Sequence, residues 1–140
     1  MVLVDSSVWI TAGKAHGDLH VKVSLESLLE EYEAAFCGPV KLEVLGAVKK
    51  DRRKAISYFF DIIPYVAMDD AVWELAKKLS WRLRDAGLTV PWNDIVIATI
   101  AQENDCRVYS LDNHFEEIGR LTGMLLYRPG YGGSFDPGIE

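Results

Sequence analysis

Four acidic residues, Asp5, Glu43, Asp94 and Asp112, stand where the chain is expected to pass from one structural element to the next. Each is flanked by apolar residues, and a carboxylate in such surroundings is costly unless it has a partner. Each has a simpler interpretation as a turn residue or an early-helix residue. Taken together, the four positions favour a second interpretation, in which the acids converge and form an all-oxygen site for Mg²⁺ or Mn²⁺.

Such a site implies a particular chemistry. Carboxylates that bridge divalent ions can bind a phosphodiester oxygen, deprotonate a water molecule and stabilise the leaving 3′-oxygen, so no protein nucleophile is required. Without metal the carboxylates repel one another, and at least one of them should bind a proton well above its ordinary pKa. The pattern therefore predicts phosphodiester hydrolysis and a fold that is stabilised by metal.

An alternation of strands and helices is expected to position these acids. Short apolar runs predict strands over residues 2–5, 34–37, 63–67, 106–110 and 124–127. Helices are predicted over residues 40–48, 69–87 and 91–103. The last of these is apolar nearly all round and should be central. The pattern favours an α/β fold with a parallel sheet, and all four acids would lie at the edge beyond the carboxyl ends of the strands, where ligands bind.

Size and composition place limits on the class of protein. A chain of 140 residues with 49% apolar and 26% charged residues is typical of one globular domain. No apolar run reaches the roughly 18 residues of a spanning helix, and the first residues predict a strand rather than a signal peptide. We interpret Cys37 and Cys106 as buried thiols of a cytoplasmic protein, with a disulfide as the alternative. The net charge of −6 is unusual for a nucleic-acid enzyme, but a bound cation reverses the local sign.

The residues around the acids resemble a known family. The segments 2–10 (Val-Leu-Val-Asp-Ser-Ser-Val-Trp-Ile), 42–45 (Leu-Glu-Val-Leu), 93–101 (Asn-Asp-Ile-Val-Ile-Ala-Thr-Ile-Ala) and 108–118 (Val-Tyr-Ser-Leu-Asp-Asn-His-Phe-Glu-Glu-Ile) are similar to the PIN-domain ribonucleases. Within that group they look most like the VapC toxins of toxin–antitoxin pairs. The resemblance runs in order from Val2 to about Tyr127. No single motif is specific, and the order and spacing together carry the resemblance.

The resemblance implies a fold and a function. It implies that Asp5, Glu43, Asp94 and Asp112 bind Mg²⁺ or Mn²⁺ and catalyse RNA hydrolysis, with Ser7 and Ser110 as supporting hydroxyl residues. It also implies a PIN-like three-layer α/β/α sandwich around a mainly parallel five-stranded sheet of order 3-2-1-4-5. Residues 1–128 would form the nuclease domain, and residues 129–140 a flexible glycine- and proline-rich tail with no assigned role. The expected partners are the RNA substrate, a second copy of the chain, and an antitoxin that can occupy the acidic groove.

Several further residues have more than one possible role. We expect RNA contacts from Lys49, Lys50, Arg52, Arg53 and His114. The basic residues are equally compatible with a solvated turn, and the histidine with a structural position or a base. Trp9 and Trp92 can stack on bases or simply pack.

The sequence disfavours two other functions. A phosphatase of the haloacid dehalogenase type needs a second aspartate two residues after the first, where this chain has Ser7. A receiver-type phosphoacceptor domain needs an acidic pair and a lysine-bearing strand that the sequence does not offer. A housekeeping PIN nuclease without an antitoxin and an inactive PIN-like binding module remain as alternatives.

Overall fold

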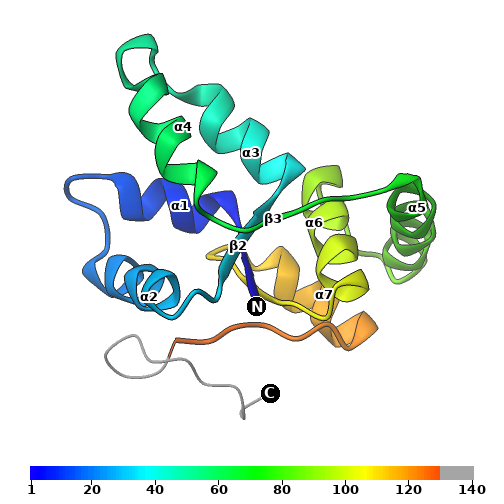
Figure 1. The fold of residues 1–140 in the computed structure, drawn as a ribbon. Coiled ribbons are helices and arrows are strands. Elements are labelled where there is room, and N and C mark those ends of the chain that lie inside the picture. Colours follow the sequence, from blue (N-terminus) through cyan, green and yellow to red (C-terminus); the bar gives the residue numbers. More distant parts are fainter. Residues whose placement is uncertain (130–140) are drawn as a thin grey trace.

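The computed structural model describes residues 1–129 as an α/β fold in which helices cover both faces of a small sheet (Figure 1). The elements in chain order are β1 (Val2–Val4), α1 (Ser6–Gly13), α2 (Leu19–Glu30), β2 (Ala34–Cys37), α3 (Gly38–Val44), the 3₁₀ turns η1 (Leu45–Ala47) and η2 (Lys50–Arg52), α4 (Arg53–Asp61), β3 (Tyr65–Val66), α5 (Asp70–Asp85), α6 (Trp92–Glu103), β4 (Arg107–Tyr109) and α7 (His114–Thr122). Figure 1 shows α1 and α2 on one side, α5, α6 and α7 on the other, and α3 and α4 projecting from the same end of the molecule.

The strands of the described part form a parallel sheet of order β3-β2-β1-β4. Leu3 pairs with Ala35 of β2 and with Val108 of β4, so β1 is central and buried on both faces. The predicted order 3-2-1-4 is therefore confirmed. Every strand of this sheet was predicted, although β1, β3 and β4 are shorter than expected.

The predicted fifth strand over residues 124–127 is wrong. In the described chain this segment makes a single parallel bridge, Leu126 to Val108. The amide of Val108 donates to Leu125 (3.1 Å) and the amide of Tyr127 donates to Val108 (2.8 Å). Pro129 follows two residues later and has no N–H with which to extend the ladder. The segment occupies the expected place beside β4 without becoming a strand.

The two best-marked helices are found where the sequence predicts them. Asp69 caps α5 by accepting a hydrogen bond from the amide of Val72 (3.3 Å), and Gly87 follows the helix with a φ of 77°. In α6, every residue from Asp94 to Ala101 is buried. This confirms that α6 is a central helix, and it fixes the direction in which its first turn points.

The third predicted helix differs from its prediction. Residues 40–48 were expected to be helical, but α3 begins at Gly38, directly after β2, and ends at Val44 before η1. Glu43 is consequently the second-last residue of a short helix, not a residue of the first turns of a longer one.

Cys37 and Cys106 are buried free thiols, as interpreted from the sequence. None of the helices in residues 1–129 has the length and apolar character to cross a membrane. The predicted tail, residues 129–140, lies outside the described residues except for Pro129.

Candidate metal centre

Asp5 lies at the carboxyl end of β1 and is held by hydroxyl groups. It is 3% exposed and caps α1, whose first turn brings Ser7 back toward the carboxylate. The hydroxyls of Ser7 and Ser110 both donate to Asp5 Oδ2, each at 2.8 Å. These are the two residues that the family resemblance marked as supporting, and both contact the first acid.

The same two hydroxyls hold the loop that follows β4. Ser7 Oγ accepts from the amide of Leu111 (3.1 Å), and Ser110 Oγ accepts from the amide of Asp112 (3.0 Å). Each hydroxyl thus donates to Asp5 and accepts from the loop that carries Asp112. Asp112 is positioned relative to Asp5 by a network of neutral donors rather than by a direct contact.

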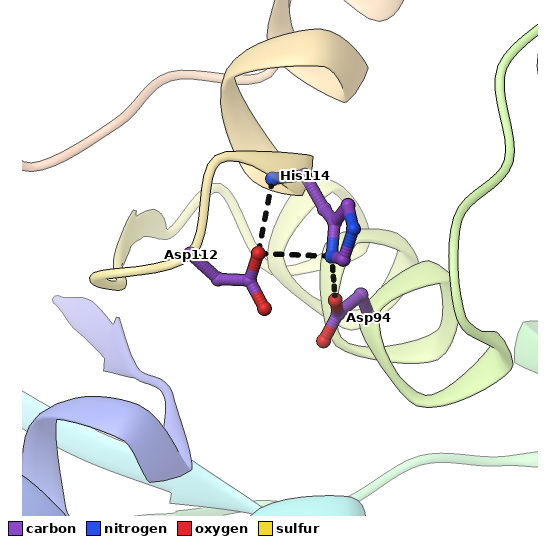
Figure 2. Close-up of side chains that lie close together, drawn as sticks. All are labelled: Asp94, Asp112 and His114. Atoms are coloured by element: carbon purple, nitrogen blue, oxygen red, sulfur yellow. Dashed lines mark hydrogen bonds and ion pairs between the residues drawn. The ribbon is translucent and has the colours of Figure 1, made fainter.

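Asp94, Asp112 and His114 form a close cluster (Figure 2). One ligand atom from each lies within 4.8 Å of the others. Nδ1 of His114 is 2.9 Å from Asp94 Oδ2 and 2.9 Å from Asp112 Oδ1, and the His114 amide also donates to Asp112 Oδ1 (3.3 Å). Asp94 comes from the first turn of α6, Asp112 from the loop after β4, and His114 from the start of α7.

The charge of this cluster is incompletely compensated. Burial raises the pKa of Asp94 to about 6; the hydrogen bond from His114 opposes this, and the negative charges of Asp5 and Asp112 reinforce it. Partial burial lowers the pKa of His114, but the hydrogen bond to Asp94 and the charges of Asp112, Asp94 and Glu117 outweigh it, so the pKa is raised. The effect of Asp5 on Asp94 indicates that the two carboxylates share one electrostatic environment.

Glu43 reaches toward the same region from α3. Burial raises the pKa of the Cys37 thiol to about 12; a backbone hydrogen bond at Val40 opposes this, and the charges of Asp5 and Glu43 add to it. Cys37 ends β2, so both carboxylates act on the carboxyl edge of the sheet. Within residues 1–129, Glu43 Oε1 is buried without a hydrogen-bond partner. A buried carboxylate oxygen without a donor is costly unless it has a cationic partner.

These observations fit a hard divalent cation. The donor set is dominated by carboxylate oxygens, which Mg²⁺ and Mn²⁺ prefer. Within residues 1–129 the Glu43 oxygen has no donor, and burial is the main cause of the raised pKa of Asp94. A bound cation would offset both costs. Asp94 and Asp112 belong to the close cluster, whereas Asp5 and Glu43 are outside that group of ligand atoms. The charge of Asp5 acts on Asp94, and the charge of Glu43 acts on Cys37 at the same edge of the sheet.

The remaining candidates divide between the interior and the surface. Trp9 is buried: its ring packs on Phe60, with centroids 4.9 Å apart, and its Nε1 donates to the Val4 carbonyl. Packing is therefore the correct interpretation of Trp9. Trp92 is 63% exposed at the first residue of α6. Lys49, Lys50, Arg52 and Arg53 are exposed at η2 and the start of α4.

Comparison with known proteins identifies the family. Residues 2–121 match the family model of the PIN domain. Ribonuclease VapC11 of Mycobacterium tuberculosis is 31% identical over 129 residues, which cover 89% of this chain and 96% of that protein.

Two crystal structures share the fold. The FitAcB structure from Neisseria gonorrhoeae has a TM-score of 0.72 at 14% identity, covering 92% of this chain and 98% of that one. VapBC2 from Rickettsia felis, bound to a DNA fragment from its promoter, also has a TM-score of 0.72, at 19% identity, covering 90% and 97%. With the family model and the VapC11 relative taken together, this chain belongs to the PIN-domain family and, within it, to the VapC ribonucleases.

Proposed function

We propose that the chain is a Mg²⁺- or Mn²⁺-dependent endoribonuclease whose metal-binding and catalytic residues are Asp5, Glu43, Asp94 and Asp112. The observation that carries this proposal is the meeting of Asp94, Asp112 and His114 at the carboxyl edge of the sheet, with ligand atoms within 4.8 Å. Membership of the VapC ribonucleases supplies the reaction class. The electrostatic links of Asp94 to Asp5, and of Glu43 to the same edge, support the complete set of four.

In this proposal each residue has a distinct task. A bound divalent ion supplies Lewis-acid polarisation of the scissile phosphodiester and a hydroxide nucleophile from water. Asp94 and Asp112 would hold the ion, and the buried Glu43 oxygen would offer a further ligand. Asp5 would shape the site. Ser7 and Ser110 donate to its Oδ2, each at 2.8 Å, whereas its Oδ1 accepts one longer hydrogen bond, from the Ser6 hydroxyl at 3.4 Å, and would be the oxygen offered to the ion or its water.

We propose that the substrate backbone crosses the exposed basic segment before it reaches the acids. The exposed basic residues lie directly before η2, on η2 and at the start of α4: Lys49, Lys50, Arg52 and Arg53. Figure 1 shows α4 projecting from the molecule together with α3. Lysine and arginine at such positions bind phosphates and supply affinity without sequence readout. His114 is a further candidate for a contact with the RNA.

The central test is RNA cleavage by the purified chain. Cleavage of a single-stranded RNA should require Mg²⁺ or Mn²⁺, should stop on addition of EDTA, and should resume when Mn²⁺ is added in excess. Cleavage at the same rate in EDTA would contradict the proposal, and failure to cut any RNA in either metal would favour an inactive binding module.

We further propose that the protein is the toxin of a pair, acting in the cytoplasm, and that its antitoxin covers an apolar hollow bordered by α1, the helix that Asp5 caps. The hollow has a volume of about 360 Å³ and is lined by residues of α1, α2 and α4, among them Ile10, Leu25 and Phe59. Ile10 and Phe59 remain 45% and 41% exposed. An apolar surface of this kind is typical of a protein interface.

Growth assays separate the toxin from a housekeeping nuclease. Expression of the chain should slow host growth, and Asp94→Asn should not. Co-expression of a small antitoxin encoded beside the gene should restore growth for the wild type, but not for Phe59→Arg. Normal growth on expression of the active enzyme would favour the housekeeping alternative.

A homodimer and the domain limits are also part of the proposal. Trp73, Trp81 and Trp92 are each half or more exposed on α5 and α6, and a hollow of about 220 Å³ lies between Trp73 and Trp92. These aromatic residues would suit a contact with a second copy of the chain. Residues 1–128 form the proposed nuclease domain. Sedimentation should give a dimer for the wild type and a monomer for Trp73→Glu; a monomeric wild type would contradict this.

A further inference from the structure

His114 places a hydrogen-bond donor at the point between two carboxylates that a cation would occupy. Its Nδ1 lies 2.9 Å from an oxygen of Asp94 and 2.9 Å from an oxygen of Asp112 (Figure 2). When both carboxylates are ionised they only accept hydrogen bonds, and the forms of His114 that satisfy them are those with a proton on Nδ1. We propose that His114 is a positioning residue that stands in for the metal: its ring holds Asp94 and Asp112 together in the metal-free protein and turns aside when the ion binds. This inference rests on the proposed function.

The two aspartates need such a residue. They approach each other from α6 and from the loop after β4, and like charges at this separation repel in a partly buried setting. A shared N–H partly offsets that repulsion and keeps the oxygens at a separation that an ion can bridge. Without the donor, the more exposed Asp112 would be expected to move toward solvent, because its side chain is 41% exposed against 6% for Asp94.

The ring is suited to leaving rather than to staying as a ligand. Mg²⁺ prefers oxygen ligands, whereas imidazole is a ligand typical of zinc, copper, iron and nickel. The His114 side chain is 33% exposed, so the ring can turn toward solvent. When the ring turns away, the loop stays anchored, since the His114 amide donates to Asp112 Oδ1 and the Asp112 amide donates to Ser110 Oγ. These backbone bonds do not depend on the imidazole.

Removal of the ring should therefore have two opposite effects. The metal-free protein should become less stable, because the Asp94–Asp112 repulsion is no longer offset. The affinity for metal should rise, because the ion no longer has to displace an internal donor. If His114 had no role at the site, its removal would produce neither effect. If the ring were a metal ligand, its removal would lower the affinity for metal.

The experiment measures Mn²⁺ binding by calorimetry without RNA, and melting in EDTA, for the wild type and His114→Ala. We expect a lower melting temperature in EDTA and Mn²⁺ binding about fivefold tighter, a factor within what one charge-assisted hydrogen bond contributes. His114→Gln, whose amide can still donate, should fall between the two. The matched control is His16→Ala, at an exposed position outside the cluster, and should match the wild type in both measurements.

Each other outcome overturns the inference. Weaker Mn²⁺ binding by His114→Ala would make the ring a ligand. An unchanged dissociation constant with a lower melting temperature would make it a plain structural residue. Should His114→Ala fail to fold, His114→Phe, which keeps a ring without the donor, gives the same measurement. If the wild type binds no Mn²⁺, the proposed function itself fails; if it binds Mn²⁺ and the variants do not differ, only the role of His114 fails.

Discussion

The two halves of the acidic edge are built differently. Asp5 is buried at the end of β1 and receives two short hydrogen bonds from the neutral hydroxyls of Ser7 and Ser110. Asp94 is equally buried, but its partner is His114, which it shares with Asp112, and burial together with neighbouring negative charge raises its pKa to about 6. The first half has two neutral donors on one oxygen, whereas the second shares a single donor between two carboxylates, and burial disfavours the charge of Asp94.

The difference indicates a division of labour. Neutral hydroxyls can fix a carboxylate without competing with an ion for its charge, so the Asp5 half acts as a rigid frame. Carboxylates whose charge is only partly compensated gain more from a cation, so in the proposed function the Asp94–Asp112 half would supply the metal affinity. Variants that alter one half at a time test this contrast.

The largest effect is expected from Asp94→Asn. In the proposed function this change removes a metal ligand, and a loss of several kcal/mol of metal-assisted stabilisation corresponds to about a thousandfold or more in cleavage rate. Folding should be retained, because the amide fits the same space. Single-turnover RNA cleavage and circular dichroism measure the two properties. Undiminished cleavage would show that Asp94 has no part in the mechanism, and the proposed difference between the two halves would then be wrong.

A smaller effect is expected from Ser110→Ala. The change deletes one donor to Asp5 and the acceptor for the Asp112 amide, so the frame loosens while every carboxylate remains. Loss of a residue that orients a metal ligand typically costs about 10- to 100-fold in activity. Ser57→Ala, an exposed serine on α4, is the matched control. Equal rates for the two variants would show that the hydroxyl frame is dispensable.

The pH dependence of stability should separate the halves in metal-free protein. The pKa of Asp94 is raised from 3.8 to about 6 by folding, so the native state binds this proton more tightly than the unfolded state. Stability is therefore lost as the pH rises from about 4 to 6, and Asp94→Asn should escape that loss.

Urea unfolding in EDTA measures this difference. Asp94→Asn should be more stable than the wild type by about 1–2 kcal/mol at pH 7.5, with the difference shrinking toward pH 4. A constant difference across this range would mean that Asp94 is not the destabilised carboxylate.

The smallest effect is expected away from both halves, at the basic segment. The double change Lys50→Gln with Arg52→Gln should weaken RNA binding about severalfold and flatten its salt dependence, since each lost phosphate contact reduces the slope by roughly one. Metal affinity should not change. Lys78→Gln on α5 is the control. If binding measured at several salt concentrations is the same for all three proteins, these residues are only solvated.

Much of this arrangement follows from local sequence signals. Apolar runs marked β1 to β4, and the uniformly apolar character of α6 predicted a central helix that delivers Asp94 inward. The predicted fifth strand failed because a single bridge at Leu126 is followed by Pro129, so an apolar run alone overestimates pairing.

Other features were missed for identifiable reasons. The helix α1 was not predicted because Ser6–Gly13 shows no amphipathic period. The helix α7 could have been found, because Phe115 and Ile118 lie three residues apart and are both buried. The bridging position of His114 depends on α6 meeting the loop after β4. No spacing within the sequence encodes that contact, so His114 was placed among candidate RNA contacts rather than between the acids.

The bond between Ser110 and Asp5 joins residues 105 positions apart, and β1 pairs with β4 across a similar span. During synthesis, almost the entire chain must therefore be made before Asp5, which follows β1, can accept this hydrogen bond from Ser110. A ribosome-bound nascent chain that ends before β4 cannot assemble the centre. Contacts so distant in sequence also form slowly, and a cell that makes this nuclease gains an interval in which the growing polypeptide is harmless.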